Sequence, residues 1–244
     1  MSLLLALVLS QATYYTPEEA QTLFAQANDA YYKQDYATAK AGYLRLVERG
    51  LGGPDVLFNL GTACLAAGDI GEGVVYLERA RRLSRADDIE ANLTFARKQM
   101  LDQVVGAGTD DPFLERLVRA TNERELSVMF LVSWWVGFAL LLSTRWLTRG
   151  RLFASTSAAM LLLLGIGTGS GVAAHAWIAR TVVEAVVIPA TAQVREFPGE
   201  NGRVAFEIHS GLKVRLVEES GRFARIRLPN GLEGWTERAG VTQL

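Results

Sequence analysis

The stretch LSVMFLVSWWVGFALLLST, residues 126–144, contains no ionisable side chain and is bounded by Glu125 and Arg145. A helix of this length spans roughly 28 Å, close to the hydrocarbon thickness of a bilayer. The alternative is a helix buried in a protein core, but core helices rarely run so far without a charge. The stretch therefore predicts a transmembrane helix.

A second apolar stretch, residues 152–179, is interrupted only by His175 and is long enough to cross a membrane with some tilt. The connector RWLTRGR, residues 145–151, carries three arginines and no acidic residue. Short arginine-rich loops favour the cytoplasmic side of a membrane. We expect a transmembrane hairpin with a cytoplasmic tip, which leaves both flanking domains on the outer side.

Small residues mark one part of the second span. Gly165, Gly167, Gly169 and Gly171 alternate along it, and small residues at such spacing let helix backbones approach closely in lipid. Packing against the first span of the same chain is the favoured use of these glycines. A dimerisation face is the alternative.

The extreme N-terminus predicts a signal peptide over residues 1–12. Residues 3–9 are apolar but too short to span, and Ser10-Gln11-Ala12 suits signal peptidase. Lys and Arg are missing before the apolar run, so an uncleaved anchor or a misassigned start is the alternative. Export of the N-terminal domain agrees with the hairpin orientation. We expect a bacterial inner-membrane protein whose folded domains are both periplasmic.

Residues 13–105 show helical patterning with self-similarity near a 34-residue period, the mark of stacked helix pairs. Asp35 recurs as Asp69, and Tyr43 recurs as Leu77. A capping helix is expected over residues 88–101. Its apolar face comprises Ile89, Leu93, Ala96 and Met100. Two repeats and a cap are a minimal stack, so we expect contact with the membrane-proximal helix or another subunit.

The second copy, with Asn59-Leu60-Gly61 and then Gly68-Asp69, resembles a tetratricopeptide repeat. Gly61 would let the first helix of the pair lie close to the second, and Gly68 would make the turn. The first copy has Gln34 at the position of Gly68. The second copy departs from the family pattern at Gly73 and Arg85, where Ala and Pro are usual.

This resemblance implies a concave groove that binds an extended or helical peptide. The matching positions are Asp29, Tyr32 and Lys33 in the first repeat and Phe58, Asn59, Thr62 and Leu65 in the second. A carboxylate clamp needs paired Asn and Lys side chains. Asn59 is present but Asp29 occupies another clamp position, which argues against a clamp. Simple packing is the alternative use of Phe58.

Residues 106–125 connect this domain to the first span. Residues 106–111 are a polar, glycine-containing linker, and residues 112–126 predict a short helix. Phe113, Leu114, Leu117 and Val118 fall on one face of that helix. The face predicts a helix lying along the membrane surface. A helix packed on the repeat is the alternative.

Residues 184–244 change to short alternating strands, expected at 186–188, 191–195, 213–217 and 223–228. Asn230-Gly231 predicts a type I′ hairpin between the last of these strands and a strand at Gly234-Trp235. The spacing predicts a small all-β barrel.

Specific residues of this segment resemble the bacterial SH3 family: Val194-Arg195 with Pro198, His209-Ser210-Gly211 before a strand, and Gly234-Trp235. The resemblance implies binding of peptides or cell-wall peptidoglycan, with Phe223 and Trp235 as an aromatic platform. The alternative is that both rings fill a small core. His209 is expected at the surface.

Catalytic and cofactor motifs are missing from the sequence. It has no nucleotide-binding loop, metal-ligand spacing or nucleophile elbow, and its one cysteine, Cys64, rules out an intramolecular disulfide. The 25 basic and 26 acidic residues nearly cancel, which argues against a nucleic-acid partner. We expect a non-enzymatic protein without cofactor or metal.

The order of segments, with Tyr31-Tyr32-Lys33-Gln34-Asp35-Tyr36, Phe58-Asn59-Leu60-Gly61 and YLERARRL at 76–83, resembles the BatE proteins of the Bacteroides aerotolerance operon. The fold class expected is multidomain: tetratricopeptide repeats, a transmembrane hairpin and an SH3-like barrel. The resemblance implies membrane partners with von Willebrand A domains, a MoxR-type ATPase system, and a role in oxidative or envelope stress. The leading hypothesis is a membrane-anchored scaffold. The alternative is a peptidoglycan-binding protein acting through its β domain.

Overall fold

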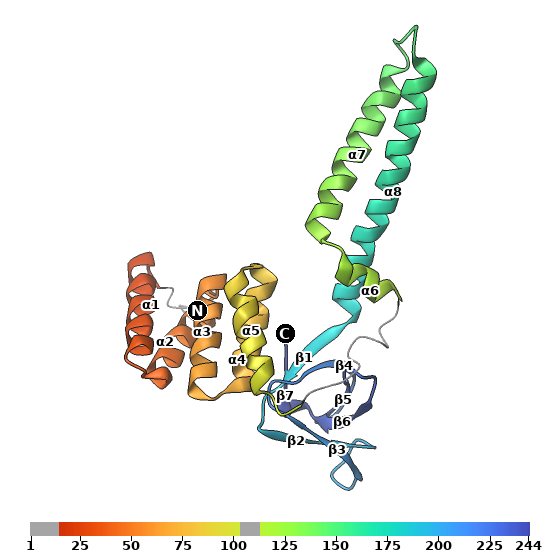
Figure 1. The fold of residues 1–244 in the computed structure, drawn as a ribbon. Helices are drawn as coiled ribbons and strands as arrows, with labels where there is room; N and C mark the ends of the chain where they lie inside the picture. The colour runs from red at the N-terminus through yellow and green to blue at the C-terminus, as the bar shows by residue number, and fades with distance from the viewer. Residues whose placement is uncertain (1–14, 103–112) are drawn as a thin grey trace, which may run out of the picture.

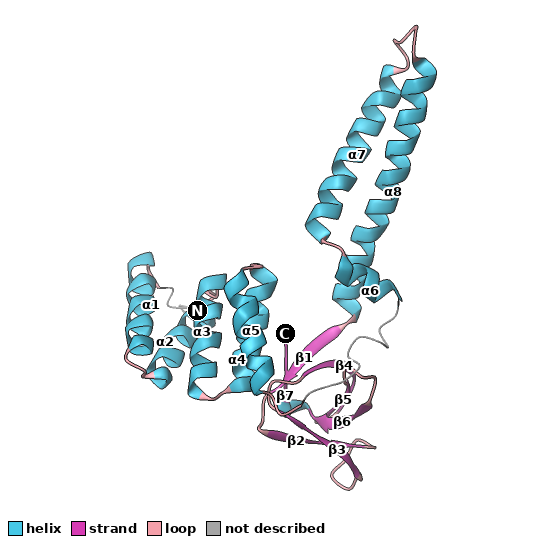
Figure 2. Cartoon of the chain, viewed as in Figure 1, coloured by secondary structure: helices cyan, strands magenta, loops and turns pink. Residues whose placement is uncertain are grey.

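A computed structural model describes residues 15–102 and 113–244. The predicted signal peptide, residues 1–12, and the linker at 106–111 lie outside the described residues. Figure 1 shows three parts: a row of helices, a curved sheet beside it, and a long helical hairpin that projects away from both. Helices and strands are segregated between these parts (Figure 2). The expected combination of a helical domain, two apolar helices and a β domain is therefore present.

The N-terminal part, here called the helical stack, consists of α1 (Pro17–Tyr32), α2 (Tyr36–Glu48), α3 (Pro54–Ala67), α4 (Ile70–Leu83) and α5 (Asp87–Gln99). Local signals define the helix starts. Thr16 and Glu19 form a reciprocal capping box on α1, and the side chain of Asp35 accepts a hydrogen bond from the backbone of Thr38 at the start of α2. Each helix packs against the next one along the chain.

The turn geometry repeats at the 34-residue interval that the sequence predicts. Backbone N–H groups of Gln34 and Asp35 donate to the carbonyls of Tyr31 and Ala30. The same pair of bonds recurs 34 residues later, from Gly68 to Leu65 and from Asp69 to Cys64. Gly68 has φ +88°, and Gln34 has φ +62°, the only positive value for a non-glycine residue in the described ranges. The first turn therefore adopts a left-handed conformation that costs a residue with a Cβ roughly 1–2 kcal/mol.

Glycine allows the close contact between α3 and α4. A Cβ on Gly61 would lie 2.7 Å from Cγ of Leu77, and a Cβ on Gly73 would lie 2.6 Å from Cδ2 of Leu65. Both distances are shorter than real Cβ contacts. The departure from Ala at position 73 thus has a packing reason, because Leu65 occupies the space that a methyl group would need.

The C-terminal part is one antiparallel sheet in the order β3-β2-β6-β5-β4-β1-β7. Its strands are β1 (Val183–Val187), β2 (Thr191–Arg195), β3 (Val204–His209), β4 (Lys213–Ser220), β5 (Phe223–Arg227), β6 (Glu233–Glu237) and β7 (Val241–Gln243). β3 and β7 were not among the predicted strands. Ile208 of β3 and Val241 of β7 share one core cluster, so the sheet curls around a single apolar core.

The turn between β5 and β6 differs from the predicted type I′ hairpin. A type I′ turn needs φ > 0 at two successive residues, but only Gly231 of this turn has a positive value, +86°. The N–H of Gly231 donates to the carbonyl of Leu228, closing a turn with Pro229 at its second position. Proline fixes φ near −65°, which favours a type I turn followed by a left-handed glycine.

The hairpin consists of α7 (Glu123–Ser143) and α8 (Arg151–Thr181), close to the predicted spans 126–144 and 152–179. Both are long and apolar enough to cross a membrane by length and composition, with mean hydropathies of 2.0 and 1.6. A core helix of a soluble protein would bury its large side chains. Trp135 and Phe153 are instead 70% and 78% exposed.

Three of the four alternating glycines face α7. Gly165 lies under Trp134, Gly169 under Phe130 and Gly171 under Leu126, each with a side-chain atom 3.0–3.1 Å from where a Cβ would be. Gly167 faces open space. The favoured prediction, packing within one chain, thus accounts for three of these residues.

A short helix, α6 (Phe113–Ala120), precedes the hairpin. The prediction of one continuous helix over 112–126 is wrong, because the helix is interrupted at Thr121 and Asn122. The side chain of Asn122 accepts a hydrogen bond from the backbone N–H of Arg124, and this cap starts α7 as a separate helix.

The helical stack and the sheet share an interface, here called the seam, between α4 and β1. Ala185 and Val187 of β1 point into the core of the sheet, whereas Val186 between them belongs to the core of the stack. The N–H of Gly71 at the start of α4 donates to Oγ of Ser210, 2.9 Å away. One strand therefore contributes to two cores. The stack thus has an additional contact, but with the sheet, which was not the expected membrane-proximal helix or second subunit.

Charged side chains close the seam. Glu78 of α4, whose side chain is 4% exposed, accepts from Arg81 and lies 3.5 Å from Nζ of Lys213. Glu184 of β1 pairs with Lys213 at 3.1 Å and with Arg82 at 3.2 Å. The YLERARRL stretch therefore supplies Glu78 and Arg82 to the contact with the sheet, together with Arg79, whose guanidinium donates to the carbonyl of Gln243.

Candidate functional site

A row of polar side chains crosses α1, α3 and α5. Oη of Tyr43 donates to Oδ1 of Asn28 at 2.6 Å, and Nδ2 of Asn59 donates to the same oxygen at 3.2 Å. Nδ2 of Asn92 donates to Oγ1 of Thr62 at 2.8 Å. These bonds place Asn28, Asn59, Thr62 and Asn92, here called the polar row, on one face of three neighbouring helices.

Two exposed aromatic residues extend this face. Tyr32 lies one helical turn beyond Asn28 and is 83% exposed, and Phe95 lies one turn beyond Asn92 and is 54% exposed. The polar row with Tyr32 and Phe95 is here called the repeat face. Asn59, Thr62 and Tyr32 were predicted for the groove. Asn28, Asn92 and Phe95 were missed, although Asn28, Asn59 and Asn92 recur at nearly the repeat interval.

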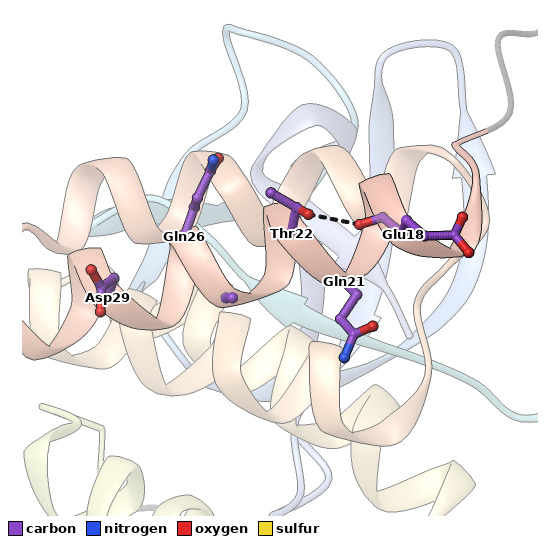
Figure 3. Close-up of a pocket in the computed structure, with 6 residues that line it drawn as sticks. Glu18, Gln21, Thr22, Gln26 and Asp29 are labelled. Carbon is purple, nitrogen blue, oxygen red and sulfur yellow. Dashed lines mark hydrogen bonds between the residues drawn. The ribbon is translucent and has the colours of Figure 1, made fainter.

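Asp29 and Lys33 are both exposed but pair with each other, with 3.2 Å between Nζ and Oδ2. An open hollow of about 560 Å³ adjoins Asp29. Its lining among the described residues is Glu18, Gln21, Thr22, Ala25, Gln26 and Asp29, all from α1 (Figure 3). The Thr22 hydroxyl donates to the carbonyl oxygen of Glu18 along the same helix. A single helix surface does not enclose a ligand, so the hollow adds no site.

Two predicted groove residues have packing roles. Leu65 is 7% exposed and lies against Gly73 of α4, so its assignment to the groove surface is corrected. A residue on the inner side of α3 contacts α4 instead of solvent. Phe58 is half-buried and packs against the core of the stack, which supports the packing alternative for this ring.

The outer surface of the sheet contains Phe223 and Trp235. Ala224 and Ile226 are fully buried, so Phe223 and Arg225, which alternate with them along β5, point to the other side. Phe223 is nevertheless only 8% exposed, with the guanidinium of Arg222 lying 5.4 Å from its ring centroid. Phe223 therefore offers little open ring surface, which corrects its expected role in a platform.

Trp235 is half-buried and pairs across the sheet with Arg195 on one side and Arg225 on the other. Glu233 on the same strand forms ion pairs with Arg225 and Arg227. Burial raises the pKa of Glu233, but hydrogen bonds from these two arginines outweigh it and leave the pKa below its usual value. Much of the charge beside Trp235 is thus already paired.

His209 does not lie free at the surface. Its backbone N–H donates to Oδ2 of Asp102 at 2.6 Å, and its Nδ1 lies 2.8 Å from Oδ1 of the same carboxylate. Asp102 follows α5 in the helical stack. The expected surface histidine therefore belongs to the seam, in the turn that Gly211 and Ser210 complete.

Cys64 of α3 is fully buried in the apolar core that this helix shares with α1 and α2. Burial raises the pKa of its thiol to about 12, against a smaller lowering by the nearby Lys40. The thiolate is the reactive form of cysteine, so this residue has a packing role. Within residues 15–102 and 113–244, His, Cys, Asp and Glu form no group of three placed to hold a metal ion.

The repeat face is thus the surface where exposed aromatic rings and amide side chains come together on one scaffold. Comparison with known proteins finds no family model and no curated relative that matches this chain.

Proposed function

We propose that this chain is a non-enzymatic, membrane-anchored scaffold that binds an extended segment of a partner protein on its repeat face. The observation that supports this most directly is the polar row, flanked by the exposed rings of Tyr32 and Phe95. Amide side chains both donate and accept hydrogen bonds, as a peptide backbone does. Exposed aromatic rings supply the large apolar contact area that dominates protein interfaces.

The anchor has a physical role in this proposal. The stack, the sheet and the bases of α7 and α8 lie at the same end of the hairpin (Figure 1). A partner held in the same membrane therefore meets the repeat face at a raised effective concentration. Weak contacts of a small repeat surface then suffice for a lasting complex.

Orientation follows from charge. Arg145, Arg149 and Arg151 lie at the tip of the hairpin, at the end remote from both folded parts. Arginine in a short loop favours the cytoplasm, so we propose that the helical stack and the sheet are periplasmic in a bacterial inner membrane. A membrane-impermeant maleimide tests this with the variant Asn201→Cys. Labelling is expected in intact spheroplasts, and labelling only after lysis would reverse the orientation.

The family proposal is a BatE-type protein with tetratricopeptide repeats and an SH3-like domain. It is supported by the 34-residue recurrence of the turn bonds and by the order of the segments. The proposed partners are membrane proteins with von Willebrand A domains, together with a MoxR-type ATPase system, in an envelope or oxidative-stress complex. The peptidoglycan alternative has less support, because Phe223 is covered and the charges beside Trp235 are paired.

The binding experiment uses the full chain in nanodiscs, because the sheet packs on the helical stack. A purified von Willebrand A-domain membrane protein is the probe. The double variant Tyr32→Ala and Phe95→Ala is expected to weaken capture at least about tenfold, the effect of losing about 1.4 kcal/mol of binding free energy. Leu83→Ala, at an exposed apolar residue at the end of α4, is the matched control and should bind normally. Equal capture by the double variant would contradict the proposed face.

A further inference from the structure

One face of α6 is apolar and exposed although the helix is held firmly in place. Phe113 is 73% exposed, Leu114 39% and Leu117 48%. These residues are spaced for one side of a helix. Exposed apolar area of this kind is unfavourable in water and marks a surface that another apolar phase covers.

The opposite side of α6, which carries Glu115 and Val118, is occupied. Oε2 of Glu115 lies 2.6 Å from a guanidinium nitrogen of Arg215 on β4, and the two side chains are 13% and 19% exposed. Val118 is 9% exposed, and α6 packs across α8. These contacts fix the rotation of the helix about its axis. Rolling the apolar face inward would break the ion pair with the sheet.

The position of α6 adjoins the apolar band of the hairpin. The helix ends three residues before α7 begins, and Oγ1 of Thr121 lies 3.0 Å from Nε2 of His175 on α8. Figure 1 shows α6 crossing α8 at the base of the hairpin, between the two apolar helices and the sheet. Trp177, half a turn beyond His175, is 57% exposed, and tryptophan is enriched at the level of lipid headgroups.

The charges at this level suit a lipid surface. Arg116, Arg124 and Arg180 are exposed there, beside two acids, Glu123 and Glu125. Arginine side chains reach headgroup phosphates while their stems stay on apolar surface. An apolar face with flanking arginines is the pattern of helices that lie in the membrane interface.

We infer that α6 is a membrane-surface helix whose Phe113, Leu114 and Leu117 face lies in the boundary between headgroups and acyl chains. Because Glu115 joins α6 to β4, the helix sets the height of the sheet above the bilayer. Because the helical stack packs against the sheet at the seam, its distance from the bilayer is fixed as well. The inference rests on the proposed membrane anchoring of the hairpin.

The test measures depth with a nitroxide attached to single cysteines in the full chain, reconstituted in phosphatidylcholine–phosphatidylglycerol vesicles. Cys64 is buried, so labelling is confined to the added cysteine. Leu117→Cys reports α6, Leu131→Cys reports the lipid-facing side of α7, and Asn201→Cys reports a water-exposed turn of the sheet. Collisions with oxygen and with a water-soluble nickel complex are compared at each site.

The oxygen-to-nickel collision ratio at position 117 is expected between the high value at 131 and the low value at 201. A value at 117 equal to that at 201, with 131 still in lipid, would overturn the inference and leave the anchor intact. Low collision ratios at both 117 and 131 would contradict the proposed membrane anchoring of the hairpin. Spin–spin broadening at 117 that disappears on dilution with unlabelled protein would assign the face to a second copy instead. Phe113→Cys should repeat the result for 117 and guards against a local effect of one label.

Discussion

The contact between α7 and α8 and the seam between the helical stack and the sheet both depend on glycine, but in different surroundings. In the hairpin, Gly169 and Gly171 of α8 contact the side chains of Phe130 and Leu126 of α7. In the seam, Gly71 lies directly against the backbone of β1, and ion pairs further along α4 join Glu78 and Arg82 to the sheet.

The proposed membrane anchoring of the hairpin accounts for this difference. In lipid, apolar side chains gain little from meeting each other, so close packing against small residues has to supply the association. At the seam, which lies outside the proposed membrane spans, burying Val186 is itself favourable by roughly 1.5–3 kcal/mol. The buried carboxylate of Glu78 then needs partners, and Arg81 and Lys213 provide them. The seam therefore depends on close packing together with charge pairing, whereas the hairpin depends on close packing alone.

The largest effect is expected from Val186→Asp. The new carboxylate would lie fully buried in the core of the stack and should weaken the seam by ~3–5 kcal/mol, the scale for an uncompensated buried charge. Hydrogen exchange of the β1 and α4 amides, followed by mass spectrometry on the full chain in nanodiscs, measures it as lost protection. Val204→Asp on edge strand β3, where Val204 is 37% exposed, is the matched control. Full protection of β1 in Val186→Asp would mean that the two cores are not joined through this strand.

Gly71→Ala is expected to have the next largest effect. The added Cβ would lie 2.7 Å from the carbonyl oxygen of Val187 and 2.9 Å from Cα of Ile188, and neither backbone atom can move aside cheaply. Overpacking of this kind costs about 1–3 kcal/mol. The same exchange experiment should show opening of the seam with α1 and α2 unaffected. Gly53→Ala, which meets nothing within 4 Å, should leave the seam protected.

Within the hairpin, Gly169→Ala should cost about 1 kcal/mol, at the low end of overpacking, because the ring of Phe130 can shift. Thermal melting in nanodiscs, followed by the near-ultraviolet circular dichroism of the tryptophans, reports this change. Gly167→Ala faces open space and provides the control in the same helix. Equal melting of both variants would show that glycine is not needed where α8 meets α7.

The smallest effect is expected from Arg82→Gln. The Arg82 side chain is 47% exposed, so solvent screens its 3.2 Å pair with Glu184, and Lys213 still neutralises that carboxylate. The loss should stay below about 1 kcal/mol and shrink further in high salt. Seam exchange measured at low and high ionic strength tests both points. A loss as large as that of Gly71→Ala would mean that charge, and not packing, dominates the seam.

Much of the fold was predictable because its signals are local. The uncharged run at 126–144 and the second run at 152–179 differ from the structural helices by at most three residues at any end. The turns at Gln34 and Gly68 also follow from residues next to them in sequence. Edge strands β3 and β7 were missed, because a three-residue strand such as β7 exists only through its pairing with β1.

The candidate site was predictable only in part. The resemblance to tetratricopeptide repeats predicted Asn59, Thr62 and Tyr32 for the groove, and these three residues lie on the repeat face. Sequence spacing alone did not distinguish Leu65, which packs on Gly73, from a surface residue such as Thr62. The two residues lie about one turn apart on the same helix, so the spacing does not show which of them faces α4. Phe95 was missed because its helix was interpreted only as a cap.

The amino-acid sequence by itself determined the helical repeat, the two long apolar helices and the change to strands after residue 182, since each depends on residues within a few positions of one another. Only the tertiary structure decided that Val186 joins the helical core, that His209 meets Asp102, and that Glu78 faces Lys213. These partners are separated by about a hundred residues or more along the chain. Such long-range contacts depend on how the folded helical stack and the folded sheet fit together, and local sequence patterns do not predict them.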